Sequence, residues 1–144
     1  MSKLKTISRV LLIKEWNVRE LESAQKMARI EFDTERLTLD TFINTLRHTE
    51  DSLDEKIKGR IANLYVLQMY YDYIETVNNK IILQQAVVNQ KEAELSQKTD
   101  ALIEGYKDKR LIEIMKEKAI KQENLEANRK EQKEIDYLWL SRMR

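Results

Sequence analysis

Residues 64–144 begin LYVLQMYYDYIETVNNKIILQQAVVNQKEAELSQKTDALIEGYKDKR and continue to the end of the chain with no proline and one glycine, Gly105. This composition predicts one helix over nearly the whole stretch, because proline and glycine are the residues that most weaken helices. Such a helix would extend roughly 120 Å at 1.5 Å per residue. It is too long to fold around a globular core. The sequence therefore predicts a rod, with the first part of the chain packed along it.

The composition of the whole chain is typical of a solvated helical surface. The 144 residues contain no proline, no cysteine and two glycines, and 26 basic residues nearly balance 25 acidic ones. Nucleic-acid binding usually needs a clear basic excess, and a disulfide or thiolate metal site needs cysteine. The apolar runs are far shorter than the ~18 residues of a membrane span. We expect one domain over residues 1–144 without a cofactor, a metal, a nucleic-acid partner or a membrane span.

The N-terminal sequence MSKLKTISRVLLIKEW resembles the start of a secretory signal, with basic residues before an apolar run. The run covers only residues 10–13, and Lys14 and Glu15 follow it directly. The apolar region of a signal peptide is longer, at ~7–15 residues. We therefore do not expect a signal peptide.

A seven-residue repeat predicts the first helix over about residues 3–55. Its seam positions are Leu4, Ile7, Leu11, Lys14, Val18, Leu21, Gln25, Ala28, Phe32, Glu35, Leu39, Phe42, Leu46, Thr49 and Leu53. Only Lys14, Gln25, Glu35 and Thr49 in this register are polar. A strict heptad repeat of this length predicts a left-handed coiled coil with one partner helix.

The turn is predicted at about residues 55–63 and the second helix at about residues 64–140. Gly59 can adopt the left-handed conformation that ends a helix, and Lys56 and Lys58 suit a helix C-terminus. The predicted fold is all-α, a two-helix antiparallel coiled coil (helical hairpin) with a longer second helix. We expect a monomeric hairpin, and a domain-swapped dimer is the alternative.

The predicted seam of the second helix alternates two sets of residues. The first set is Leu67, Ile74, Ile81, Val88, Leu95 and Leu102, and the second is Leu64, Tyr71, Asn78, Gln85, Glu92, Thr99 and Tyr106. This register is predicted to fail near residues 107–110 and to shift through Leu111, Met115 and Leu125. With the turn centred near Gly59, residue i faces roughly residue 118 − i. Leu4 then faces residue 114, Lys14 lies near Glu104, and some thirty residues of the second helix have no partner.

The sequence offers no recognisable catalytic group. His48 is the single histidine and lies near acids, without a second histidine or a cysteine to complete a metal site. The chain has no glycine-rich phosphate loop and no nucleophile paired with a histidine base. We interpret His48 as an exposed helix residue and expect no enzyme activity.

Aromatic residues provide two candidate binding surfaces. Tyr71 is predicted on the seam, whereas Tyr73 and Val77 are predicted off it, with Lys80 and Gln84 continuing the same face. This face is either ordinary helix surface or a docking patch, since aromatic residues are enriched at interfaces.

The second candidate is Trp139, which lies with Leu138 and Leu140 in an otherwise polar region. It either marks a partner site or folds back on the first helix, which carries Trp16.

Two segments resemble a known family. Residues 128–136, NRKEQKEID, are similar to the Arg-x-x-Gln-Lys-x-x-Asp-Glu signature of the FliJ-type proteins of the bacterial flagellar type III export apparatus, with Tyr137 in place of the last acid. Residues 7–15, ISRVLLIKE, resemble the start of these proteins. The likeness covers the full length of the chain. It extends more distantly to counterparts in virulence secretion systems.

The resemblance implies a cytoplasmic stalk protein, peripherally associated with the inner membrane at the flagellar base. Its terminal end would enter the ring of the export ATPase and promote its hexamer and activity. The matching ATPase contacts are Ile7, Val10, Leu11, Arg129, Gln132, Lys133, Asp136 and Arg142. The resemblance also implies docking to the cytoplasmic domain of the export gate through Tyr73, Val77, Lys80 and Gln84, and binding of export chaperones.

Two alternatives remain at this point. One is the equivalent stalk of a virulence type III secretion system. The other is a generic structural or chaperone coiled coil, which would expose an apolar tip near residues 50–63. We expect that tip to be acidic instead, because Glu50, Asp51, Asp54 and Glu55 precede the turn.

Overall fold

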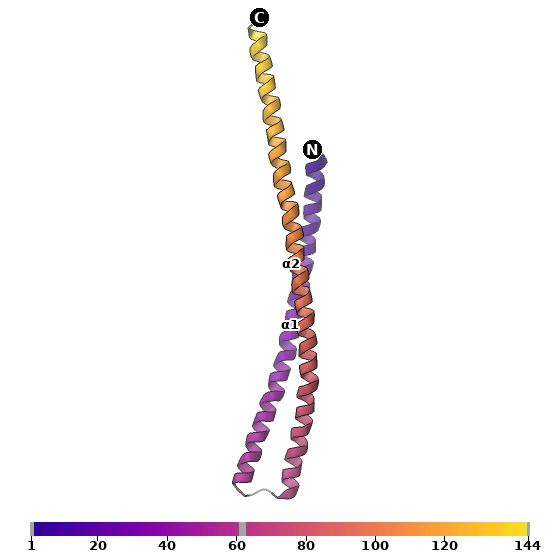
Figure 1. The fold of residues 1–144 in the computed structure, drawn as a ribbon, viewed down its shortest axis with the longest axis vertical. Helices are drawn as coiled ribbons and strands as arrows, with labels where there is room; N and C mark the ends of the chain where they lie inside the picture. Colours follow the sequence, from indigo (N-terminus) through magenta and orange to yellow (C-terminus); the bar gives the residue numbers. More distant parts are fainter. Residues whose placement is uncertain (1, 61–62, 144) are drawn as a thin grey trace. The chain divides into compact units, whose positions relative to one another are not determined.

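The computed structural model describes residues 2–60 and 63–143. It consists of two helices, α1 (Ser2–Lys58) and α2 (Leu64–Arg142), joined by a short turn (Figure 1). The predicted all-α hairpin with a longer second helix is therefore confirmed. Helix α1 ends three residues beyond the predicted residue 55, and α2 begins at the predicted residue.

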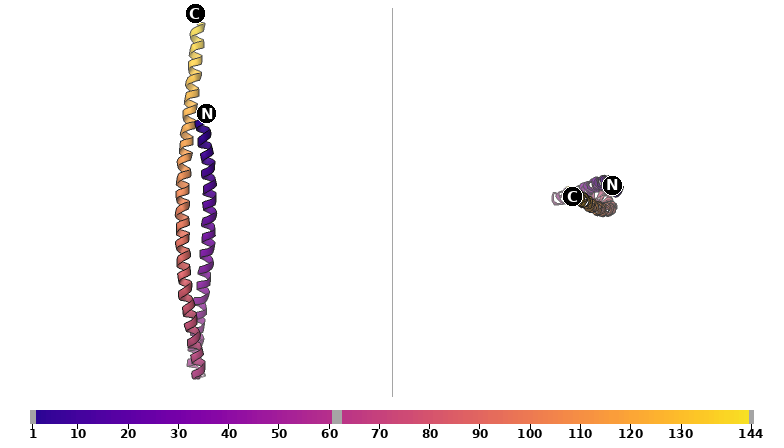
Figure 2. Two further views of the ribbon diagram at one scale, coloured as in Figure 1. Left: turned by 90° about the vertical axis from the view of Figure 1, so that its right-hand side faces the viewer. Right: turned by 90° about the horizontal axis from the view of Figure 1, so that it is seen from above.

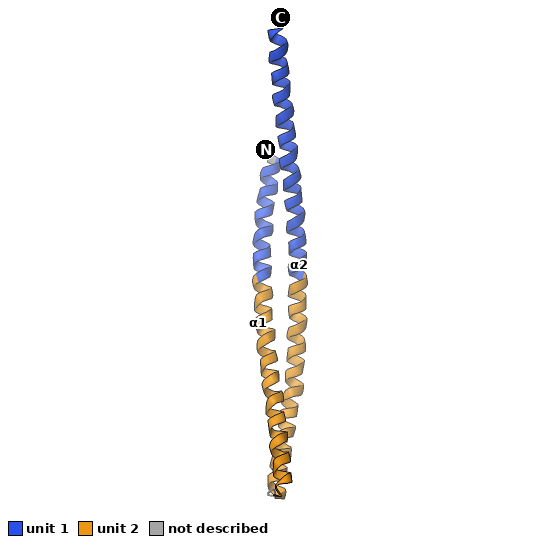
Figure 3. Ribbon diagram, turned by 90° about the vertical axis from the view of Figure 1, so that its left-hand side faces the viewer, with its two compact units in different colours: residues 1–22, 101–144 blue, residues 23–100 orange. Residues whose placement is uncertain are grey.

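The chain divides into two compact units (Figure 3). The turn unit, residues 23–100, contains the turn and the helical segments on both sides of it. The terminal unit, residues 1–22 and 101–144, contains the start of α1 and the last part of α2. In each unit a segment of α1 runs beside a segment of α2 (Figures 2 and 3).

The seam of α1 lies where its heptads predict it. All the predicted positions from Leu4 to Leu53 are buried or half-buried. The fully buried ones are Ile7, Leu11, Val18, Ala28, Leu39 and Leu53. Burial of apolar side chains at this spacing supplies most of the stability of a coiled coil, because helix propensity alone is marginal.

The seam of α2 differs from the prediction in one of its two sets. The set from Leu67 to Leu102 is buried or half-buried, as predicted, but nearly all of the other predicted set is exposed. Its place is taken by residues one position earlier, Tyr70, Val77 and Gln84 among them. Tyr71 is therefore outside the seam and Val77 inside it, contrary to the sequence prediction.

The register of α2 also continues where the sequence predicted a failure. In the terminal unit the same spacing continues through half-buried positions, which are Leu102, Gly105, Lys109, Ile112, Lys116, Ala119 and Glu123, while Ala101, Glu113 and Ile114 beside them are also half-buried. Leu111, Met115 and Leu125, which were predicted to carry a shifted register, are exposed. The sequence did not predict this part of the seam because several of its positions are polar. Long polar side chains can pack through their aliphatic stems and keep their charged groups at the edge of the seam.

The two helices face each other with a shift of several residues from the prediction. Lys91 Nζ lies 3.3 Å from Glu31 Oε2 in the turn unit, and Tyr106 Oη lies 2.7 Å from Glu22 Oε1 in the terminal unit. The residue numbers of these pairs add to 122 and 128, not to 118. The predicted pairing of Lys14 with Glu104 is wrong, since Glu104 pairs with Lys107.

The pairing of the start of α1 with α2 differs from the prediction in the same direction. Leu4 lies beside Ala119, Gln122 and Glu123, rather than beside residue 114 as predicted. The part of α2 that extends past α1 is consequently shorter than the predicted thirty residues.

The turn departs from the prediction in its backbone geometry. The left-handed residue is Arg60, with φ 54°, and not Gly59. The amide of Gly59 still donates to the carbonyl of Glu55, 2.9 Å away, so the helical hydrogen bonding extends to Gly59 and the reversal falls one residue later. On the other side, Asn63 caps α2, because its Oδ1 accepts a hydrogen bond of 2.9 Å from the amide of Val66.

Candidate partner-binding sites

The C-terminal end of α2 is the most exposed helical segment of the terminal unit. Every residue from 124 to 143 is exposed, whereas residues 102–123 keep a half-buried seam. The change falls where α1 begins, since Leu4 lies beside residues 119–123. We call residues 124–143 the free end of α2, which extends beyond the start of α1 in Figure 2.

The free end carries large apolar residues on all its sides. They are Ile135, Tyr137, Leu138, Trp139 and Leu140, all at least half exposed. At about 100° per residue these positions surround the helix axis instead of forming one stripe. Exposed apolar residues of this size that lie close together on a helix are typical of a surface that binds a partner. The free end therefore has the surface of a helix that is completed by a partner.

The two tryptophans do not meet. Trp139 is 63% exposed and Trp16 61% exposed, and the indole of Trp16 donates a hydrogen bond of 2.9 Å to Glu20 on its own helix. Of the two interpretations of Trp139, folding back onto α1 is therefore excluded. The exposed tryptophan is available to a partner.

Four of the predicted ATPase contacts share one face of the free end. Arg129, Gln132, Lys133 and Asp136 are all exposed and are spaced by three and four residues. Gln132 Nε2 donates to Asp136 Oδ1 at 3.1 Å, which orients both side chains along the helix. Arg142 is also exposed, on a different side of the helix.

The predicted contacts on α1 are placed differently. Ile7 and Leu11 are each only 8% exposed and belong to the seam of the terminal unit, and Val10 is half-buried beside them. The structure therefore separates the predicted set into an exposed group on the free end and a packed group on α1. Sequence reasoning missed the exposed apolar residues on the outer face of α1, which are Leu12, Ile13 and Trp16. The sequence could have indicated them, because these apolar residues occupy heptad positions that are normally polar.

The predicted gate-docking residues in the turn unit are only partly accessible. Val77 is 3% exposed and lies in the core, while Tyr73 is half exposed. Gln84 donates to the carboxylate of Glu35 at 2.6 Å, across the seam. Lys80 Nζ lies 6.0 Å above the ring of Phe42, which is within the range of a cation–π contact.

A shallow apolar cavity of about 660 Å³ lies beside Tyr73. It is lined by His48, Thr49, Ser52, Met69, Tyr70, Asp72 and Tyr73, which come from both helices of the turn unit. His48 is exposed at its edge, as predicted. The cavity therefore places a predicted docking residue, Tyr73, at the border of a concave apolar surface.

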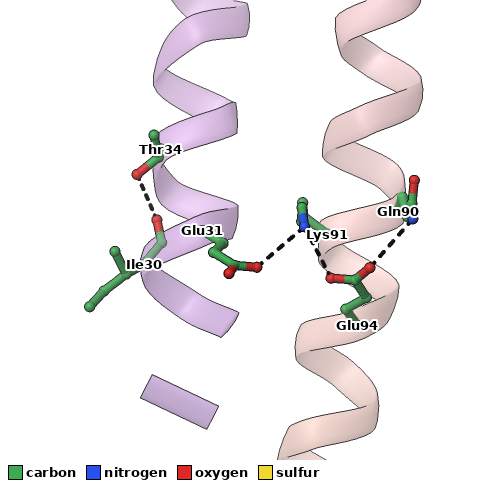
Figure 4. A network of polar contacts seen from close by, with 6 residues as sticks. All are labelled: Ile30, Glu31, Thr34, Gln90, Lys91 and Glu94. Carbon is green, nitrogen blue, oxygen red and sulfur yellow. Dashed lines mark hydrogen bonds and ion pairs between the residues drawn. The ribbon is translucent and has the colours of Figure 1, made fainter. Parts of the chain in front are cut away.

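Charged contacts between the helices lie at the edges of the seam. Lys91 contacts Glu31 on α1 at 3.3 Å and Glu94 on its own helix at 3.4 Å (Figure 4). Hydrogen bonds to Glu31 and then Glu94 raise the pKa of Lys91 above its ordinary value. In the terminal unit, the hydrogen bond to Glu22 likewise raises the pKa of Tyr106. These contacts help to fix the register of the two helices.

Within residues 2–60 and 63–143 no group of acidic, histidine or cysteine side chains could hold a metal ion. No helix in this described part is long and apolar enough to cross a membrane.

These features define a class of protein, a two-helix antiparallel coiled coil with exposed apolar residues at the free end of α2. A family model described as the flagellar FliJ protein matches residues 3–143. The chain therefore belongs to the flagellar FliJ family, and the resemblance noted in the sequence is confirmed. The family is a structural component of the flagellar export apparatus and not a catalytic one. No curated protein matches the chain. No solved structure matches it either.

Proposed function

We propose that this protein is the non-enzymatic stalk and coupling subunit of the flagellar type III export apparatus, and that the free end of α2 enters the ring of the export ATPase. The observation that carries this proposal is the free end itself, which is exposed throughout and has large apolar residues on several sides between Ile135 and Leu140. A flat partner would cover one side of such a helix and leave the others in water. A ring covers all sides at once.

In this proposal the polar face of the free end orients the helix within the ring. Arg129, Gln132, Lys133 and Asp136 offer charged and amide groups that can pair with the inner wall of a ring, and Arg142 offers a cation on another side. Ile7 and Leu11 contribute indirectly, because they pack α1 against α2 below the free end. Val10, which is half-buried, is the most accessible of the three predicted contacts on α1 and would lie closest to the rim of the ring.

The proposal includes a second contact, to the cytoplasmic domain of the export gate. Tyr73 and Lys80 would touch the gate, whereas Val77 and Gln84 would hold the two helices behind them. The cavity beside Tyr73 supports this site, because it offers an apolar hollow bordered by polar groups. Export chaperones are the third class of partner. Together these contacts would hold the protein in the cytoplasm at the inner membrane, and the family match favours the flagellar apparatus over a virulence system or a generic coiled coil.

The test is a titration of this protein into the cognate export ATPase, with turnover and oligomeric state measured together. Stimulation and hexamer formation are expected at about one chain per ATPase ring. Gln132→Ala with Asp136→Ala should reduce stimulation, while Gln85→Ala with Asn89→Ala, which removes a similar exposed i,i+4 pair in the turn unit, should act as the unaffected control. Full stimulation by the double variant would remove the polar face from the proposal. Gate binding is tested separately with Tyr73→Ala, which should weaken it without loss of helicity.

A further inference from the structure

The end of the turn unit carries exposed apolar side chains close to exposed cations. Leu64 is 84% exposed, Tyr65 is 74% exposed and Ile57 is about half exposed. Lys56, Lys58 and Arg60, which lie close to them in the sequence, are also exposed. We call these six residues the turn surface. It is distinct from the cavity beside Tyr73, which none of them lines.

The charge of this region changes sign along the chain. Glu50, Asp51, Asp54 and Glu55 are acidic, as noted from the sequence, but residues 56–71 contain three cations and no acid. Glu55 precedes the last residue of α1 by three positions, which places it roughly 4.5 Å farther from the turn at 1.5 Å per residue. The cations are therefore the charges nearest to anything that meets the turn.

The cations of the turn surface are also unpaired within the turn unit. The charged pairs of the described residues involve Lys91, Lys107, Lys109 and Arg110, and none involves Lys56, Lys58 or Arg60. A helix C-terminus accounts for Lys56 and Lys58 in part, because cations there interact favourably with the helix dipole. It does not account for Leu64 and Tyr65, whose side chains are largely exposed.

We propose that the turn surface binds an anionic lipid bilayer, with the cations at the headgroups and Ile57, Leu64 and Tyr65 in the interfacial layer. Leucine and tyrosine beside lysine and arginine form the usual composition of interfacial anchors. A typical protein interface needs about 800 Å² on each side, and the end of a two-helix hairpin offers less. A bilayer needs no such matched area, since each cation near an anionic surface adds about fivefold to the affinity.

This inference goes beyond the proposed function, whose partners are all proteins. It gives the turn unit a lipid contact of its own that reinforces docking to a membrane-bound partner. One weak anchor and one protein contact together bind far more tightly than either alone.

The first test is sedimentation of the full chain with sucrose-loaded vesicles of phosphatidylglycerol and phosphatidylcholine, compared with pure phosphatidylcholine. Binding is expected only with the anionic lipid and should weaken as salt rises. Lys56→Glu with Lys58→Glu should lower the affinity at least roughly 25-fold, and Leu64→Ser with Tyr65→Ser should also release the protein. Lys98→Glu and Leu83→Ser, equally exposed changes in the middle of α2, are the matched controls. Absence of binding to anionic vesicles, or equal losses in the controls, would overturn the proposal and leave a protein partner as the occupant.

The second test places the turn residues in the bilayer directly. The chain has no cysteine, so Leu64→Cys gives a unique site for an environment-sensitive fluorophore. Its emission should shift to the blue on addition of anionic vesicles, while the same label at Leu83→Cys should not respond. A shift at both sites, or at neither, would contradict insertion of the turn surface. These variants should retain stimulation of the export ATPase, so failure of the lipid proposal is distinguishable from failure of the proposed function.

Discussion

Two regions of α2 use apolar residues in opposite ways. Up to residue 123 the helix keeps one seam at heptad spacing, and its contacts with α1 hold the fold together. From residue 124 to residue 143 every position is exposed, including the large apolar residues Ile135, Tyr137 and Trp139. The same helix therefore contains a region whose apolar residues are satisfied within the chain and a region whose apolar residues need a partner. The comparison predicts that substitutions will affect folding in the first region and binding in the second.

The largest expected effect on stability is at Val77. Val77→Asp should lower the free energy of unfolding by about 3 kcal/mol or more, because it buries an unpaired charge at a position that is 3% exposed. The matched change Trp139→Asp, in the free end, should leave the urea midpoint nearly unchanged. Equal midpoints for the two variants would break the distinction between the regions.

A smaller loss of stability is expected from substitution of Gly105, the glycine of the α2 seam. A Cβ atom at this position would lie 2.6 Å from Leu21 Cδ1. Gly105→Leu should therefore cost about 1–3 kcal/mol by overpacking, measured by thermal or urea unfolding. Shortening the neighbour should restore much of the loss, so the double variant Gly105→Leu with Leu21→Ala is the informative comparison. Additive losses in the double variant would show that the two helices do not approach closely here.

The smallest expected effect is on how the stability of the fold depends on alkaline pH. The hydrogen bond to Glu22 raises the pKa of Tyr106 in the folded chain above its ordinary value of about 10. A raised pKa means that the contact contributes fully below pH 10 and is lost as the pH rises through the folded value. Tyr106→Phe should thus reduce the loss of stability between neutral and strongly alkaline pH, as followed by circular dichroism. Since Tyr106 is substantially exposed, solvent screening keeps the effect small. An unchanged alkaline profile would mean that the contact does not form in solution.

The seam of α1 was predictable from the sequence and half of the α2 seam was not. Helix α1 repeats apolar residues in one register, so its buried face could be read directly. In α2 the set from Leu67 to Leu102 is equally clear, but its companion set includes Gln84 and Lys91. Gln84 reaches the carboxylate of Glu35, and Lys91 reaches that of Glu31. Polar residues with partners on the other helix occupy seam positions that a search for apolar residues passes over.

The candidate sites were likewise predictable only in part from the sequence. The free end was foreseen because the heptads fade and because Trp139 stands among polar residues. Ile7, Leu11 and Val77 were expected at binding surfaces, yet they are buried between the two helices. The prediction failed because a match to a family does not show which side of a helix faces the other helix. The turn surface was missed since the acids before the turn dominated the charge count, whereas the exposure of Leu64 and Tyr65 depends on where α2 begins.

The central claim is that the apolar free end of α2 is completed by the export ATPase. The most direct measurement is ATPase turnover during titration with the native chain and with the variant Leu138→Ser, Trp139→Ser, Leu140→Ser. The account predicts that the variant melts at the same temperature as the native chain and has lost at least tenfold in its stimulation of the ATPase, a loss of about 1.4 kcal/mol in coupling. A variant that folds normally and stimulates as well as the native chain would contradict the account.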